Sequence, residues 1–314
     1  MSQLDPRELG DFLQAPTIAL ARRPIVRPDS KIFTMGSCFA KELRKSLTIK
    51  GFKVFPDYLG IDLNDDTQHF DLRGGDMAPH FDTFVMRQEL EAAAGLWADR
   101  AEGFYAVRNN LVNKLYQWDV AYQDPYRERT YASSMSDLID MADKTTACIR
   151  QGLDTSDIVI LTLGLTEVWR HTKTGKYFLR AAGTGWGGGL EHAEFRRSTF
   201  LENYENLRAI LEIIFARDPN KNVVISVSPV RLQRTFSNVD IGTANLESKS
   251  ILRALAGQIC REYGDRVTYF PSYEMALLGV GALTGTGKIF QEDGAHVRPE
   301  FAEKVIATFQ QMFS

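Results

Sequence analysis

Runs of β-branched and aromatic residues mark the most apolar segments of this chain. Four runs between turn signals predict buried strands, and a fifth run, from Gly51, predicts one more. The runs are KIFTMG from Lys31, GFKVFP from Gly51, DIVILTLG from Asp157, NVVISVSPV from Asn222 and RVTYFPSY from Arg266. Their apolar residues do not alternate strictly with polar ones, which is typical of strands that are buried on both faces.

Segments with helical spacing of apolar residues lie between and after these strands. They cover residues 39–50, 136–151, 199–216, 246–262 and 299–313. Strands that alternate with helices predict an α/β fold in which helices cover both faces of a mainly parallel sheet. Ligands of such folds bind beyond the carboxyl ends of the strands. We therefore expect a functional edge at the loops after Thr34, Leu163, Val227 and Tyr269.

Two stretches interrupt this alternation of strands and helices. Residues 57–131 are rich in aromatic residues, prolines and charges, and only FVMRQELEAAAGLW resembles a helix. We interpret them as an irregular insertion or cap within a single domain that spans residues 1–314. Residues 173–197, which include GTGWGGG, predict a long loop over the functional edge.

Composition narrows the class of protein. The 314 residues are 44% hydrophobic and 25% charged, as in a globular protein whose core needs neither a disulfide nor a metal. The net charge is -3 and the basic residues are spread along the chain, which argues against a nucleic-acid partner. No segment offers the roughly 18 apolar residues of a spanning helix, so we expect no membrane insertion.

The cysteines indicate the cellular compartment. Cys38, Cys148 and Cys260 are far apart and odd in number, which fits a reducing compartment better than a disulfide framework. The first residues also lack the basic and apolar regions of a signal peptide. We therefore expect a cytoplasmic protein, and nothing in the sequence specifies its oligomeric state.

The stretch KIFTMGSCFA, residues 31–40, is the first candidate for chemistry. Ser37 lies where the first strand gives way to a helix, so its hydroxyl would face the functional edge. Backbone N–H groups near Ser37 and Cys38 would stabilise an oxyanion there. The alternative for Ser37 is a helix N-cap. Cys38 either packs as a small hydrophobe or is itself the nucleophile.

A serine nucleophile needs a base to activate it. The chain has five histidines, and His296 stands directly before the final helix, on the same predicted edge as Ser37. Asp293, three residues earlier, is close enough in a turn to orient the imidazole. Ser37, His296 and Asp293 would thus act as nucleophile, base and orienting carboxylate, although aspartate before glycine is also ordinary turn chemistry.

Several motifs in combination resemble those of the GSCFA family. They are GSCFA at 36–40, TLGLTEVW at 162–169, SPVRLQRTF at 228–236, TANLESKS at 243–250, YFPSYEM at 269–275 and DGAHVRP at 293–299. The family looks like a branch of the SGNH, or GDSL-like, hydrolases and acyltransferases. The resemblance implies a flavodoxin-like three-layer fold in which Ser37 matches the nucleophile and Asp293 and His296 match a D-x-x-H pair.

One departure from this pattern lies at residues 164–167, which correspond to the third sequence block of SGNH enzymes. SGNH enzymes usually carry G-x-N-D there, and the corresponding residues of this chain are Gly164, Leu165, Thr166 and Glu167. Threonine donates one hydrogen bond from a short side chain and ionised glutamate donates none, while losing one oxyanion donor costs about 3 kcal/mol in comparable sites. Asn64 and Asn245 are candidates to replace the missing donor, and Gly60 is a candidate for the glycine of the second block.

Three further residues are candidates for substrate contact. Arg231 follows a predicted strand and would grip a phosphate or a carboxylate, unless it is a solvated loop arginine. Ser248 and Lys249 lie near the predicted start of a helix, where simple capping is the alternative. No cysteine or histidine pair has the spacing of a metal site, so we predict neither a metal nor a required cofactor.

These observations lead to the hypothesis of a serine-dependent acyl-ester hydrolase or O-acyltransferase. The two activities share the attack by Ser37 and differ in whether water or an alcohol takes the acyl group. The resemblance implies small acyl esters, such as acetyl esters, of a carbohydrate or polysaccharide precursor, with acetyl-CoA or another acyl-CoA as the donor of a transferase. The alternatives are a non-catalytic carbohydrate or nucleotide-sugar binding module and an acyl carrier that uses Cys38.

Overall fold

The computed structural model divides the chain into two compact units. Unit 1 consists of Met1–Val54, Ser156–Leu165 and Asn220–Ser314, and unit 2 consists of Phe55–Thr155 and Thr166–Pro219. The expected insertion, 57–131, falls within unit 2, together with the second irregular stretch, 173–197. The residues that the structure describes are 18, 20–62, 67–69, 79–108, 111–127, 130–179, 192–278 and 289–314.

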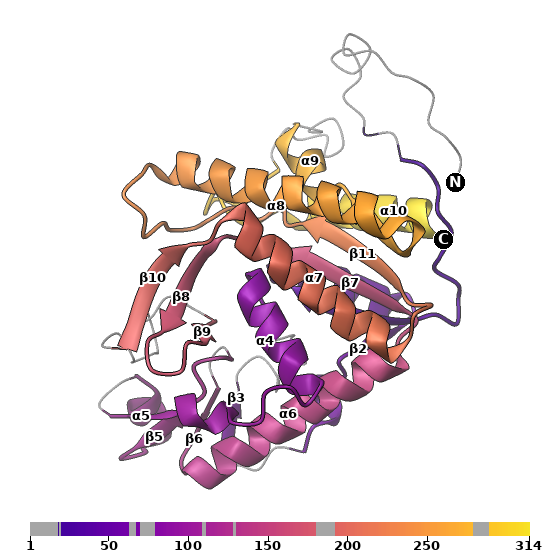
Figure 1. Ribbon diagram of the computed structural model, residues 1–314. Helices are drawn as coiled ribbons and strands as arrows, with labels where there is room; N and C mark the ends of the chain where they lie inside the picture. The colour runs from indigo at the N-terminus through magenta and orange to yellow at the C-terminus, as the bar shows by residue number, and fades with distance from the viewer. Residues whose placement is uncertain are drawn as a thin grey trace. The chain divides into compact units, whose positions relative to one another are not determined.

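A five-stranded sheet forms the centre of unit 1, in the order β12-β11-β7-β1-β2. Its strands β1, β7, β11 and β12 run parallel, and β7 and β11 lie side by side in Figure 1. All five strands lie in the apolar runs that predict them. Their bounds are β1 (Lys31–Gly36), β2 (Lys53–Phe55), β7 (Ile158–Leu163), β11 (Asn222–Val227) and β12 (Val267–Phe270).

Helices cover both faces of this sheet. One apolar cluster joins Ile32, Ile160 and Val224 of the strands to the buried sides of α2 and α10. Helix α8 contacts β11 and β12 from the other face. Unit 1 is therefore an α/β three-layer sandwich, as the alternation of strands and helices predicts. Its helices are α2 (Cys38–Ile49), α8 (Ile241–Tyr263), α9 (Ser272–Leu277) and α10 (Pro299–Phe313).

Helix α8 begins five residues before the predicted start. Asp240 caps it, with its Oδ1 accepting a hydrogen bond from the Gly242 amide at 2.8 Å. Ser248 and Lys249 therefore lie inside the helix, so the capping role that we considered for them is wrong. Both side chains are buried.

Unit 2 is more regular than the sequence predicts. It contains two antiparallel sheets, in the orders β3-β6-β5-β4 and β10-β8-β9. The strands have two to five residues, too short for their apolar pattern to stand out. They are β3 (Thr67–His69), β4 (Tyr105–Val107), β5 (Ala121–Gln123), β6 (Thr130–Ala132), β8 (Glu167–His171), β9 (Tyr177–Phe178) and β10 (Ala193–Arg197).

The predicted loop at 173–197 thus contains two strands, while GTGWGGG at 183–189 lies outside the described residues. Helix α4 of unit 2 packs against both α6 and α7 (Figure 1). The helices of this unit are α4 (Thr83–Ala93), α5 (Leu111–Tyr116), α6 (Met135–Thr155) and α7 (Phe200–Arg217). Among the helices described in either unit, none is long and apolar enough to cross a membrane.

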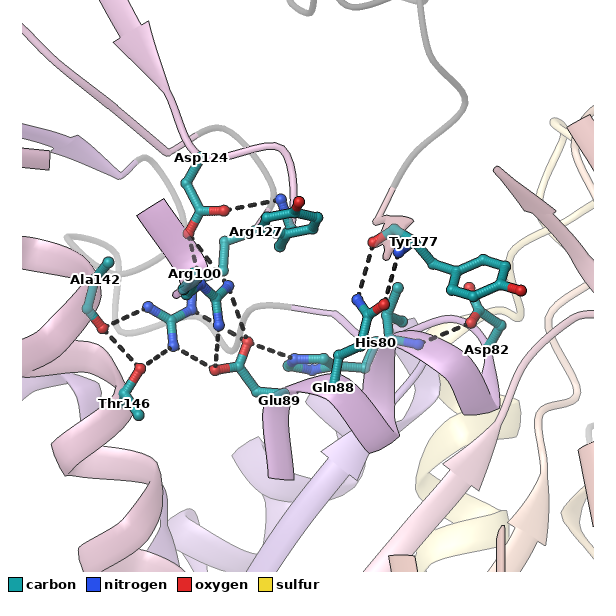
Figure 2. A network of polar contacts seen from close by, with 12 residues as sticks. His80, Asp82, Gln88, Glu89, Arg100, Asp124, Arg127, Ala142, Thr146 and Tyr177 are labelled. Atoms are coloured by element: carbon teal, nitrogen blue, oxygen red, sulfur yellow. Dashed lines mark hydrogen bonds and ion pairs between the residues drawn. The ribbon is translucent and has the colours of Figure 1, made fainter. Parts of the chain in front are cut away.

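A buried network of charges surrounds Glu89 on α4 (Figure 2). Arg100 Nη1 donates to Glu89 Oε1 at 3.2 Å, and Arg127 Nε donates to Oε2 at 3.2 Å. His80 Nε2 lies 3.5 Å from Oε2, and Asp124 accepts a hydrogen bond from Arg100 at 3.3 Å. Burial would raise the pKa of the Glu89 carboxyl, but the two guanidinium groups hold this pKa well below its ordinary value. Every charge in the network therefore has a partner of opposite sign.

Candidate active site

The end of β1 is built around Gly36. Its φ is +148°, and a Cβ atom there would lie 2.4 Å from the Thr162 carbonyl oxygen of β7. Any other residue would have to push the two strands apart. Because glycine lets the strands approach so closely, the next residue, Ser37, also bonds to β7: its amide donates to Thr162 O at 3.1 Å.

The Ser37 hydroxyl does not do what a capping serine does. Ser37 occupies the N-cap position of α2, yet its side chain accepts no hydrogen bond from the helix. Its Oγ is buried and has no hydrogen-bond partner among the described residues, and the same holds for Thr162 Oγ1 on the adjacent strand. The N-cap interpretation therefore explains the position of Ser37 but not its hydroxyl.

This geometry corrects one expectation about the oxyanion. The Ser37 N–H group already donates to Thr162 O, so it does not face a ligand. The first turn of α2 still carries N–H groups without partners inside the helix. Ser37 is also only 4% exposed, so a substrate reaches its hydroxyl only when neighbouring groups move.

Lys249 of α8 lies at the same edge of the sheet. Its Nζ donates to the carbonyl oxygen of Gly164, the residue that follows β7, at 2.6 Å. Burial lowers the pKa of Lys249 to about 7, and the electrostatic interaction with Cys38 opposes this shift. The structure thus brings together four residues that the sequence singled out, namely Ser37, Cys38, Gly164 and Lys249.

Sequence reasoning gave Lys249 only a minor role as a substrate contact. A signal was nevertheless present, since Lys249 lies on the apolar stripe that α8 buries together with Leu252, Leu255 and Ala256. A lysine at such a position is rare unless it is paired or has a function.

Asp293 and His296 form a second cluster, in the turn before α10. Asp293 Oδ2 lies 2.5 Å from His296 Nδ1, and Oδ1 accepts hydrogen bonds from the amides of Ala295 and His296. The bond from His296 and these two amides lower the pKa of Asp293 to about 2. The ionised carboxylate holds the proton of the imidazole on Nδ1, which leaves Nε2 as the proton acceptor.

The segment after β11 packs beside this pair. The Gln233 side-chain amide lies 3.2 Å from His296 Nδ1, and the Arg231 amide donates to Ala295 O at 3.1 Å. The Arg231 guanidinium stacks on the Phe290 ring, 3.6 Å from its centroid. Asn245, a candidate oxyanion donor, uses its Oδ1 to accept the Leu232 amide at 3.0 Å.

Among the described residues, no hydrogen bond joins the Ser37 hydroxyl to His296. Ser37 and His296 both belong to unit 1, but Ser37 Oγ has no partner among the described residues, His296 included. Catalytic hydrogen bonds are often long in unliganded enzymes and tighten only when the substrate binds. The catalytic roles of Ser37, His296 and Asp293 stay predictions.

The remaining candidates belong to unit 2 or lie outside the described residues. Gly60 ends a short 3₁₀ turn in unit 2 and is exposed. Thr166 and Glu167 also belong to unit 2, where the Thr166 carbonyl accepts hydrogen bonds from the Ser198 amide and hydroxyl. Asn64 lies outside the described residues. Within the described part of the chain, no three His, Cys, Asp or Glu side chains gather closely enough to hold a metal ion.

Comparisons with known proteins give remote structural neighbours and one family. A search of curated proteins found no match. A family 3 carbohydrate esterase from Clostridium thermocellum is 11% identical, with a TM-score of 0.34 over 90% of this chain and 94% of its own. Another solved structure is 14% identical, with a TM-score of 0.30 over 51% of this chain and 67% of its own. Similarity this remote does not bear on function.

The family model covers nearly the whole chain. It matches residues 31–309, from the first residue of β1 to the last turns of α10. This span includes both clusters, from the GSCFA motif at Gly36 to the turn that holds Asp293 and His296. The chain therefore belongs to the GSCFA family.

Proposed function

We propose that this protein is a serine-dependent acyl-ester hydrolase or O-acyltransferase. The observation that carries the proposal is the contact of 2.5 Å between Asp293 Oδ2 and His296 Nδ1. A carboxylate at this distance favours the tautomer with the proton on Nδ1, in which Nε2 accepts a proton, as a general base requires. The Ser37 hydroxyl lies at the end of β1 in the same unit and has no hydrogen-bond partner among the described residues. It is the group that such a base would activate.

The reaction proceeds through an acyl-enzyme. Ser37 Oγ attacks the carbonyl carbon of the ester while His296 Nε2 takes the hydroxyl proton, and the carbonyl oxygen receives the electron pair of the C=O bond. When this intermediate collapses, the bond to the leaving alcohol breaks and His296 returns the proton to that alcohol. Water or an acceptor hydroxyl then attacks the acyl-enzyme by the same steps in reverse.

The substrate class follows from the resemblance described above. We propose an acetyl or other small acyl ester of a carbohydrate, with an acyl-CoA as the donor if the acceptor is an alcohol. Binding of CoA would raise the melting temperature of the protein by mass action. An unchanged melting temperature at millimolar CoA would count against an acyl-CoA donor and leave the hydrolase.

A binding module for carbohydrates or nucleotide sugars is the second candidate. Two observations favour it: the Ser37 amide is engaged with Thr162 O, and the third block has Thr166 where SGNH enzymes carry asparagine. Under this alternative, Ser37→Ala would leave ligand affinity unchanged and no acyl-enzyme would form.

Covalent labelling by a fluorophosphonate separates these functions. In this reaction an O–P bond forms at the activated serine, the P–F bond breaks, and fluoride leaves. Intact-protein mass should rise by one adduct in the natural protein and remain unchanged in Ser37→Ala and His296→Ala. The absence of an adduct on the folded natural protein would favour the binding module, and an adduct retained in Ser37→Ala would indicate another nucleophile, with Cys38→Ala as the next variant.

Thr199 provides a matched control for the N-cap interpretation of Ser37. Thr199 caps α7 in a capping box, in which its Oγ1 accepts the Glu202 amide. Thr199→Ala should lower the free energy of unfolding by about 1 kcal/mol. Ser37→Ala removes a hydroxyl without a capping bond and should leave the free energy of unfolding unchanged or raise it. Equal losses in the two variants would support a purely structural Ser37.

A further inference from the structure

Two lysines are buried in unit 1, at opposite edges of the same sheet. Lys221 precedes β11, and its Nζ donates to the carbonyl of Ser156, which precedes β7. Lys249 donates instead to the carbonyl of Gly164, at the carboxyl end of β7. Both side chains are 2% exposed. The two residues share burial and a backbone carbonyl partner, and they differ in whether they lie at the functional edge.

The strand register places Lys249 at the same edge of the sheet as the candidate nucleophile. Gly36 of β1 is paired with Thr162 of β7, and the Ser37 amide extends the ladder by bonding to Thr162 O. Beyond this point α2 begins at Cys38, and Gly164 directly follows the end of β7. Since Lys249 Nζ is bonded to Gly164 O, the amine is held at the carboxyl end of β7, the strand to which the Ser37 amide is also bonded. Cys38 also lies within electrostatic range of the Lys249 amine.

The amine of Lys249 has unused hydrogen-bonding capacity. A lysine ammonium carries three donors, and within the described part of the chain Lys249 makes a single hydrogen bond, to Gly164 O, and no ion pair. A buried cation without a counter-ion is costly. A site that keeps such a group at the same edge of the sheet as a candidate nucleophile is suited to stabilise negative charge that arises during a reaction.

We propose that Lys249 donates a hydrogen bond to the oxyanion that forms on the acyl carbonyl when Ser37 attacks. It takes the place of the side-chain amide that the GLTE block at 164–167 lacks. The ammonium keeps its proton throughout, while His296 carries the proton of the serine. This inference rests on the proposed acyl chemistry at Ser37 and identifies the group that compensates for the missing asparagine.

The rate of fluorophosphonate labelling tests the inference, because the phosphonyl oxygen also gains negative charge as serine attacks. Lys249→Met should slow the labelling of Ser37 by about 10²–10³-fold, the effect of losing one oxyanion donor. Lys221→Met, the matched control at the other edge of the sheet, should label at the natural rate. Thermal unfolding shows whether each variant is folded, and Lys249→Gln, which keeps a polar side chain, is measured in parallel.

The pH dependence of the rate ratio separates an oxyanion donor from other roles. If the ammonium acts, the advantage of the natural protein over Lys249→Gln should shrink as pH rises above about 7, where Lys249 loses its proton. An advantage that grows with pH would assign Lys249 as a base, and one that is constant would assign it a structural role. Either result overturns the proposal.

Failure of this inference is distinguishable from failure of the proposed function. If labelling depends on Ser37 and His296 but Lys249→Met and Lys249→Gln react as fast as the natural protein, only the role of Lys249 is overturned. If the folded natural protein is not labelled at all, the proposed function fails and the role of Lys249 fails with it.

Discussion

Glu89 in unit 2 and Lys249 in unit 1 are both buried ionisable side chains, each 2% exposed, but their surroundings differ. Two arginines and His80 surround Glu89, and its pKa is held well below the ordinary value despite burial. Lys249 contacts one backbone carbonyl, and burial lowers its pKa to about 7. Glu89 therefore stays charged at neutral pH, while Lys249 is poised between its two protonation states.

This difference suits the Glu89 network to a role in stability and Lys249 to a role in function. In the Glu89 network (Figure 2), Arg127 also donates to the Ala142 carbonyl at 2.7 Å and to Thr146 at 2.8 Å, so its donors are used within the protein. Such a network ties α4 to α6 and leaves little capacity for a ligand. The Lys249 ammonium uses one of its three donors among the described residues, so the others can bind a ligand.

Removal of Glu89 should have the largest effect on stability. Glu89→Ala would leave Arg100 and Arg127 buried without their shared carboxylate, and breaking a buried ion pair from one side costs about 3–5 kcal/mol. Urea unfolding followed by circular dichroism measures this loss. A loss below about 1 kcal/mol in the free energy of unfolding would mean that water reaches the network in solution. Glu89 and Lys249 would then not differ in the way described.

Lys249 should make stability depend on pH in the alkaline range. Its folded pKa of about 7 lies below the ordinary lysine value of about 10.4. Between these values the unfolded chain binds a proton that the folded protein does not, so the free energy of unfolding rises with pH, by up to about 1.4 kcal/mol per unit. Urea unfolding at several pH values between 7.5 and 9.5 should give a steeper rise for the natural protein than for Lys249→Met. Equal slopes would contradict the lowered pKa.

Removal of one partner of an exposed ion pair should have the smallest effect on the free energy of unfolding. It provides a reference for the effects expected at the buried Glu89 and Lys249. Arg208 and Glu212 lie 3.5 Å apart on α7, with side chains that are 50% and 64% exposed. Glu212→Ala should change the free energy of unfolding by no more than about 0.5 kcal/mol, because water screens the pair. A larger loss would show that exposure alone does not explain why Glu89 matters.

The two clusters of the candidate site differ in how far the sequence predicts them. Asp293 and His296 are three residues apart in a turn, so local geometry brings them within reach, and the structure has them hydrogen-bonded. Lys249 and Gly164 are 85 positions apart. Their contact depends on how α8 packs on the sheet, and no local pattern encodes it.

Unit 1 and unit 2 show the same distinction at the level of the fold. The strands and long helices of unit 1 follow directly from apolar runs and helical spacing, because each buries a continuous face in one core. The short antiparallel strands of unit 2 bury too few residues to leave such a pattern. Each of these strands has only two to five residues.

The sequence by itself determined the family motifs, the α/β alternation and the local pairing of an acid with a histidine, because each is encoded by residues near one another in the chain. The tertiary structure alone decided that the Ser37 hydroxyl is not a cap, that its amide is bonded to Thr162, and that Lys249 lies at the same edge. These features arise where segments distant in sequence pack together. There, burial removes water and makes the remaining partners of each polar group decisive.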